Sequence, residues 1–127
     1  DKIGLLADPG TNVDTLDQMI HFIESSTSEG DRIFAFPWSP EIYFLTNRAN
    51  ATSFDTPLSY VTRHYQNKMI EELIENNPKY VVYNPNFAVG GLSRDVLKEV
   101  DDYILNNYYS VAEYEKFSIL APHPSKK

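Results

Sequence analysis

The segment Arg32–Glu41 reads Arg-Ile-Phe-Ala-Phe-Pro-Trp-Ser-Pro-Glu and decides the fold. After the arginine, its first half is apolar on both faces, which is typical of a strand covered on both sides. In its second half the serine is a good N-cap, the proline after it suits the first helical position, and the glutamate complements the helix dipole. We predict a strand over Arg32–Phe36 and, directly after it, a helix over Pro40–Thr46.

The same pattern of alternating elements extends along the rest of the chain. Apolar residues at helical spacing predict helices over Val13–Ser26 and Thr62–Asn76, and a third helix that Ser93 caps. Short β-rich runs predict strands over Tyr80–Tyr83, Ser110–Tyr114 and Phe117–Leu120, the last two as a β-hairpin. This alternation favours an α/β fold, an open three-layer domain with a mostly parallel sheet flanked by helices and a C-terminal β-hairpin.

Length and composition bound the class of protein. With 127 residues, 42% of them hydrophobic, the chain suits one globular domain, and we predict a single α/β domain over 1–120 and a flexible tail over 121–127. The 11 basic and 18 acidic residues give a net charge of −7, the wrong sign for a nucleic-acid partner. The chain has no cysteine, which excludes disulfides and cysteine nucleophiles.

Motifs for cofactors, metals and catalysis are missing from the sequence. It contains no G-x-G-x-x-G, no G-x-x-x-x-G-K-[ST] and no G-x-S-x-G. His21, His64 and His123 lie far apart without metal-ligand spacing. The acidic pairs Glu71-Glu72 and Asp101-Asp102 lie opposite apolar helix stripes, where a solvated face explains them. We predict no cofactor, no metal and no catalytic residue in this chain.

The two loops that follow the first two strands are the predicted binding region. In open α/β sheets ligands bind outside the carboxyl ends of the strands, which here are followed by Pro37–Glu41 and Asn84–Gly91. Trp38 offers a flat amphipathic surface for a sugar or lipid headgroup, and Asn84 and Asn86 can hydrogen-bond hydroxyl groups. The alternative is that Trp38 packs into the core or onto another domain.

A long connection over Asn47–Tyr60, which shows no sustained period and is predicted to be irregular, adds further candidates. Arg48 carries a fixed fork of donors that suits a carboxylate or phosphate; the alternative is that it pairs internally with an acidic residue and only braces the loop. Asn50-Ala51-Thr52 is an N-x-T sequon. The predicted contact residues are Trp38, Glu41, Tyr43, Arg48, Asn50, Thr52, Phe54, Asn84 and Asn86.

The stretch Asp31–Phe54, with its Pro-Glu-Ile-Tyr-Phe-Leu core and an Asn-Arg step, resembles the C-terminal region of GT-C membrane glycosyltransferases, which are similar to dolichyl-phosphate-mannose-protein mannosyltransferases. Met69–Ile74, Asn77–Val82 and the hairpin to Phe117 extend the resemblance to about residue 120. It implies a Rossmann-like, non-catalytic extracytoplasmic domain of a polytopic enzyme that transfers a sugar from a lipid-phosphate donor. The implied partners are the membrane domain of the same polypeptide and a lipid-linked sugar or an acceptor glycan or protein, because the domain would support the membrane part or recognise acceptor.

Two other classes of function remain open. One is a carbohydrate- or peptide-binding module of another surface protein, which would use Trp38 and the Asn84–Gly91 loop as its platform. The other is a small α/β enzyme of the nucleotide-binding kind, for which the sequence supplies no phosphate-binding loop.

Overall fold

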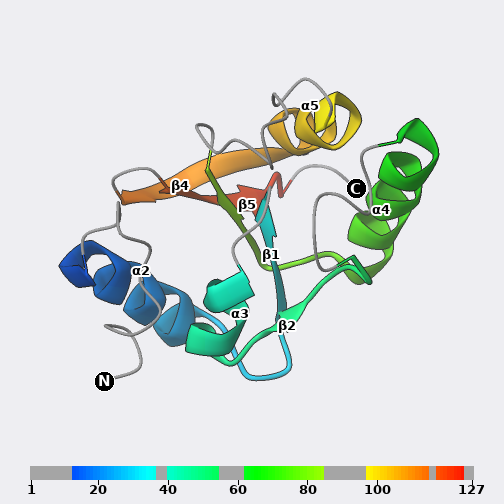
Figure 1. Ribbon diagram of the computed structural model, residues 1–127. Coiled ribbons are helices and arrows are strands. Elements are labelled where there is room, and N and C mark those ends of the chain that lie inside the picture. The colour runs from blue at the N-terminus through cyan, green and yellow to red at the C-terminus, as the bar shows by residue number, and fades with distance from the viewer. Residues whose placement is uncertain (1–12, 37–39, 55–61, 85–96, 115–116, 125–127) are drawn as a thin grey trace.

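The structure is a computed structural model that describes residues 13–36, 40–54, 62–84, 97–114 and 117–124. Over these residues the chain has mixed α/β content, with four helices and one five-stranded sheet (Figure 1). The helices are α2 (Val13–Ser26), α3 (Pro40–Thr46), α4 (Arg63–Asn76) and α5 (Lys98–Asn107). The strands are β1 (Arg32–Phe36), β2 (Ala49–Asn50), β3 (Tyr80–Tyr83), β4 (Tyr108–Tyr114) and β5 (Phe117–Pro122).

The deciding segment folds as predicted, with β1 followed directly by α3 at the expected bounds. The helices predicted around α2 and α4 and the strand predicted at β3 are also confirmed. Helix α5 begins at Lys98, and Ser93, which was predicted to cap it, lies outside the described residues. The connection predicted to be irregular contains the short strand β2, whose two residues are too few to produce a period in the sequence.

The sheet is mixed, with strand order β2-β1-β3-β5-β4. Strand β1 pairs in parallel with β2 and with β3, and Ile33 lies opposite Tyr80. Strand β5 pairs antiparallel with both β3 and β4, which gives the expected C-terminal pair of antiparallel strands. The sheet is therefore mixed in its pairing rather than mostly parallel as predicted, because β5 lies between β3 and β4 and runs against both of them.

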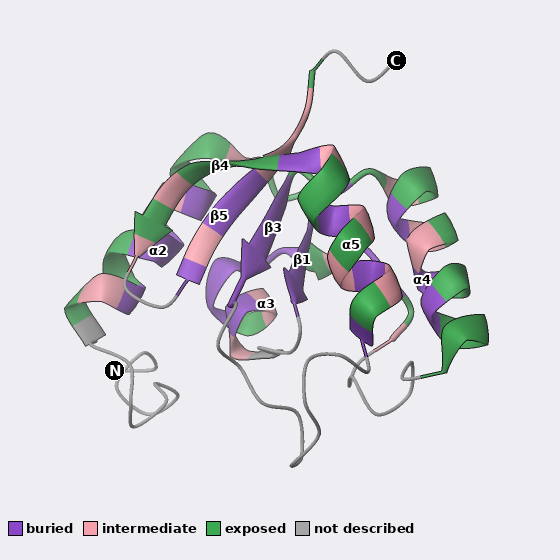
Figure 2. Cartoon of the chain, turned by 90° about the horizontal axis from the view of Figure 1, so that it is seen from above, coloured by how far each residue is buried: buried purple, intermediate pink, exposed green. Residues whose placement is uncertain are grey.

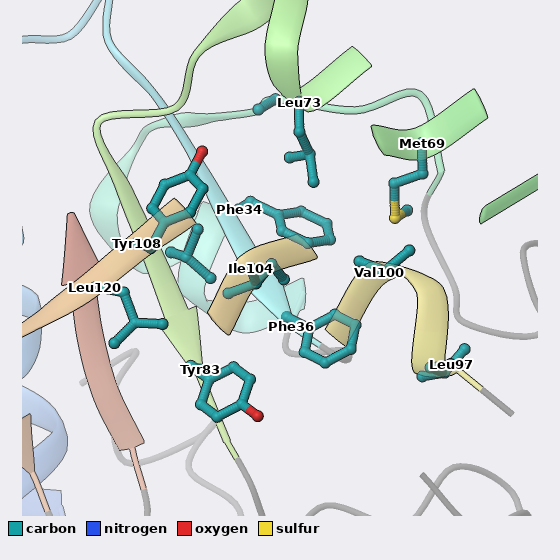
Figure 3. Packing of buried hydrophobic residues seen from close by; sticks show 12 residues of the cluster. Phe34, Phe36, Met69, Leu73, Tyr83, Leu97, Val100, Ile104, Tyr108 and Leu120 are labelled. Carbon is teal, nitrogen blue, oxygen red and sulfur yellow. The ribbon is translucent and has the colours of Figure 1, made fainter. Parts of the chain in front are cut away.

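One hydrophobic cluster joins α4 and α5 to the sheet. Figure 3 shows Phe34 and Phe36 of β1 facing Met69 of α4 and Ile104 of α5, all of them buried. Burying a large apolar side chain completely stabilises a fold by roughly 1.5–3 kcal/mol. This cluster therefore fixes the two helices against the sheet, and the ring of Phe36 also stacks on Tyr83, with centroids 5.8 Å apart.

A second cluster joins α2 and α3 to alternate residues of the same strands. Met19 and Ile23 of α2 and Ile42 of α3 are fully buried, and they belong to a cluster with Ile33 and Ala35 of β1. Successive side chains of a strand point to opposite faces, so β1 contributes to both clusters and is buried from Ile33 onward. Figure 2 shows α2 and α4 far apart, with the buried strands between them.

Side chains complete the ends of α4 and α5. The Thr62 hydroxyl accepts a hydrogen bond from the Tyr65 N–H at the start of α4, and Asn77 ends that helix in the left-handed conformation, with φ 46°. The buried Gln66 side chain accepts hydrogen bonds from the N–H groups of Glu99 and Val100, at 3.0 and 3.3 Å. Because no residue of α5 caps its own start, Gln66 ties α5 to α4.

Candidate functional site

The carboxyl ends of β1 and β3 lie side by side. Phe36 is paired with Tyr83, and the Asn84 N–H donates to the Phe36 carbonyl at 2.9 Å. The two loops predicted to bind ligand therefore leave the sheet at neighbouring points. Asn84 is buried, whereas Trp38, Asn86 and most of both loops lie outside the described residues. Glu41 lies half-buried in the first turn of α3.

Tyr43 completes the hydrogen bonding of the central strand. Its hydroxyl oxygen accepts a hydrogen bond from the Ala35 N–H at 2.8 Å, beyond the point at which the short strand β2 stops pairing with β1. Burial raises the pKa of Tyr43 well above its usual range, although the Ala35 hydrogen bond acts in the opposite direction. The geometry gives Tyr43 a bracing role between α3 and β1.

Arg48 binds the carbonyl ends of two helices. Its side chain is buried and donates to the carbonyl oxygens of Glu24 and Thr27 at the end of α2, and of Thr46 and Asn47 at the end of α3, at 2.9–3.4 Å. Its Nε donates to the Thr27 hydroxyl at 2.8 Å. A cation beside the last carbonyls of a helix complements the negative end of the helix dipole. Among the described residues its partners are neutral, so it braces the loop without the internal acidic partner that was considered.

The segment after β2 is a tight turn built on Asn50. Its side-chain oxygen accepts hydrogen bonds from the Thr52 N–H and hydroxyl, at 2.9 and 3.1 Å, and its amide donates to the Phe54 carbonyl at 2.9 Å. Thr52 is buried and Phe54 packs at the edge of the α4–α5 cluster. The sequon is thus folded into an Asx-type turn in which the Asn50 amide is already engaged.

The predicted contact residues from Glu41 to Phe54 are largely used within the fold, and they do not form one group: Tyr43 packs against the cluster of α2 and α3, and Phe54 against the cluster of α4 and α5. Contact with a ligand or a partner stays a prediction for them, as it does for Asn84. Chemistry for a metal is not assembled elsewhere either: over the ranges that the structure describes, no three His, Asp or Glu residues gather as a set of metal ligands. Of the helices described, none is both long enough and apolar enough to cross a membrane.

An open groove of about 760 Å³ lies at the opposite, amino ends of β1 and β3. We call it the amino-end groove. Its aromatic and apolar lining comprises Phe22, Pro78, Tyr80, Tyr109, Val111, Ala121 and Pro122. Its remaining lining comprises Gly30, Asp31, Arg32, Glu75, Asn76, Asn77 and Lys79. Tyr109 and Val111 belong to the edge strand β4 and are 43% and 40% exposed.

Two cations mark the amino-end groove. Arg32 and Lys79 directly precede the paired residues Ile33 and Tyr80, and the Lys79 N–H donates to the Arg32 carbonyl at 2.8 Å. Within the described part of the chain, neither cationic group has a hydrogen bond or an ion pair. Like charges on neighbouring strands repel each other, so this placement has no stabilising role of its own.

The two acidic residues of the groove form no ion pair with the two cations in the described part of the chain. The Asp31 carboxylate accepts a hydrogen bond from the Ser28 N–H at 2.8 Å, which closes the turn before β1. Glu75 lines the groove from the last turns of α4. Sequence reasoning missed this groove because it searched only the carboxyl ends of the strands. The available signal was a basic residue directly before each of two buried strands in an acidic chain.

Comparison with known proteins corrects the family expectation. No curated protein and no solved structure matches the sequence significantly. A family model described as "Putative competence-induced protein Ccs4 C-terminal domain" matches residues 15–121. This match covers most of the chain and overturns the resemblance to GT-C, mannosyltransferase-like glycosyltransferases, which rested on short motifs in Asp31–Phe54. The chain therefore belongs to the family of Ccs4 C-terminal domains.

Proposed function

We propose that this domain is a non-catalytic recognition module that binds an extended acidic segment of a polypeptide in the amino-end groove. The observation that carries the proposal is the pair of adjacent cations, Arg32 and Lys79, on a groove with apolar and aromatic walls. A module of this kind needs no cofactor and no catalytic group. This proposal keeps the peptide-binding module, which is one of the alternatives that the sequence left open.

Charge supports an acidic ligand. Of the other basic residues that the structure describes, Arg48 is engaged with carbonyls, and Arg63 and Lys98 pair with Glu99 and Asp102. Lys68 is exposed on α4 away from the groove. In a chain with a net charge of −7, two adjacent cations that have no partner among the described residues form a local site for an anion.

Ring packing favours a polypeptide over a carbohydrate. A sugar binds best to an open aromatic face. In the groove, Tyr109 stacks on His123 with ring centroids 5.3 Å apart, and Phe22 lies 5.6 Å from Tyr80 and 6.3 Å from Tyr114. The rings therefore pack on one another, and the exposed Val111 beside them suits an apolar side chain.

Selection from a displayed library of random twelve-residue peptides on the immobilised domain tests the proposal. Enriched peptides should carry Asp or Glu. Their dissociation constants, measured by fluorescence anisotropy, should rise about tenfold or more with Arg32→Glu plus Lys79→Glu, because two attractive pairs become repulsive. Binding should also weaken with added salt, as expected for exposed charges.

Lys68→Glu is the matched control, since it reverses an exposed cation outside the groove and should change binding less than about twofold. Enriched peptides that lack acidic residues, or that bind the double variant as well as the wild type, would contradict the proposal. A hyaluronan oligosaccharide serves as an anionic carbohydrate probe. If it binds through Arg32 and Lys79 while no peptide is enriched, the carbohydrate-binding alternative replaces the peptide-binding one.

We also propose the finer architecture as three layers, with α2 and α3 on one side of the sheet and α4 and α5 on the other. The two separate hydrophobic clusters, which use alternate residues of β1, support this arrangement. Attachment to a membrane domain of the same polypeptide and an extracytoplasmic location stay predictions from the sequence.

A further inference from the structure

A second hollow adjoins the amino-end groove. It has a volume of about 570 Å³ and lies where the last turns of α4 and α5 meet the end of β5. Asn77 and Pro122 line both the groove and this hollow, so the two adjoin each other at these residues. A ligand that extends along the groove past Pro122 reaches the hollow.

The two hollows differ in chemistry. No Asp, Glu, Lys or Arg is among the described residues that line the second hollow, whereas the groove has four such residues. Its lining includes Ile74, Tyr103 and Tyr108, and the Ile74 side chain is 61% exposed on α4. Isolated apolar residues are ordinary on a surface, but a large aliphatic side chain that lines a hollow beside the charged groove offers a contact for an apolar anchor.

We infer that the ligand is a bipartite polypeptide segment, with an acidic residue at Arg32 and Lys79 and an apolar anchor side chain in the hollow beside Ile74. This inference rests on the proposed function. Charge complementarity selects the acidic part, and because the two hollows adjoin at Asn77 and Pro122, the same extended segment can supply the anchor. An extended chain supplies both groups at a fixed separation along its sequence.

The test uses the peptides enriched on the wild-type domain and the variant Ile74→Gln. Glutamine keeps the helix propensity and the approximate length but removes the apolar contact. We expect Ile74→Gln to weaken the binding of these peptides about five- to tenfold, because it removes an aliphatic contact that the bound anchor would bury. Replacing the apolar anchor of the peptide by alanine should cause a similar loss, and the two losses should not add, as for groups in contact.

Leu105→Gln is the matched control, because Leu105 is an exposed apolar residue of α5 that does not line the hollow. It should leave the dissociation constant within about twofold, and both variants should unfold at the same urea concentration as the wild type. If Ile74→Gln binds peptides as tightly as Leu105→Gln while the reversal of Arg32 and Lys79 abolishes binding, the bipartite inference fails and the proposed function stands. If the charge reversal has no effect, the proposed function fails first.

A second copy of this chain is the other molecule that could fill the hollow, and a further measurement tests for it. Sedimentation velocity of the wild-type domain over a range of concentrations, with and without Ile74→Gln, measures self-association. Association that Ile74→Gln abolishes would overturn the bipartite inference, because the hollow would then be a contact between copies. A monomer at all concentrations, together with the peptide result above, supports it.

Discussion

Arg32 and Arg48 stand at the starts of neighbouring parallel strands, and the two regions around them use charge in opposite ways. Arg48 belongs to the Tyr43–Phe54 segment, where side chains bind backbone groups and each other inside the fold. Arg32 belongs to the amino-end groove, where two cations have no partner among the described residues. The comparison teaches that residue type alone does not identify a binding site: the same guanidinium braces one region and stays available in the other.

The largest expected effect is on stability, from removing the Arg48 fork. Arg48→Ala leaves carbonyls at the ends of α2 and α3 without donors, and we expect a loss of about 3 kcal/mol in the free energy of unfolding. Urea denaturation measures it. Arg48→Lys keeps the charge but not the fork and should recover only part of the loss. A loss below about 1 kcal/mol for Arg48→Ala would remove the distinction between the two regions.

A smaller effect should follow from Tyr43→Phe, which removes the acceptor of the Ala35 N–H and should cost about 1 kcal/mol at neutral pH. It should also change the response to alkali. The folded-state pKa of Tyr43 is raised, so the wild type keeps this contribution below pH ~10 and loses stability as pH rises above that value.

Thermal unfolding between about pH 8 and pH 11 checks this, since Tyr43→Phe should lose less stability over the range than the wild type. A residual loss is expected, because burial also raises the pKa of Tyr108, with Tyr103 adding to the rise. Identical pH profiles of the two proteins would show that Tyr43 does not brace β1 as a neutral group.

The smallest effect on stability should come from the groove. Replacing Arg32 and Lys79 together by alanine removes a like-charge repulsion and no described partner, so stability should stay within about 0.5 kcal/mol of the wild type. Urea denaturation at low salt gives the most sensitive comparison. If the double variant lost more than about 1 kcal/mol in the free energy of unfolding, the two cations would brace the fold as Arg48 does. They would then not be available to a ligand.

Local sequence patterns predict the helices and strands well, but they predict poorly how these elements assemble into the sheet. The bounds of β1 and α3 follow from a buried apolar run and from capping residues, which are local signals. The placement of β5 beside β3 depends on pairing across more than thirty positions, for which the sequence has no local signal. The local patterns therefore predicted more parallel strand pairing than the sheet has.

The candidate site shows the same limit. The fork of Arg48 was noticed, but its partners are backbone carbonyls that no pattern of residue types can reveal. The groove depends on which strands start side by side, so the closeness of Arg32 and Lys79 is visible only in the folded structure. The glycosyltransferase resemblance was wrong because it rested on short motifs around Arg48. Such motifs reflect the residues needed where a strand joins a helix, and unrelated families share this need.

The position of β5 also constrains how the chain folds. It is the last of the described strands along the chain, yet it lies between β3 and β4 in the sheet. Until Phe117–Pro122 has been synthesised, β3 has an open edge and β4 has no neighbour, so both clusters lack residues that close them. Pairing of distant segments is slow because the loop between them must close first. We therefore expect folding to be a single late event on the ribosome, completed only once the C-terminal strand has been made.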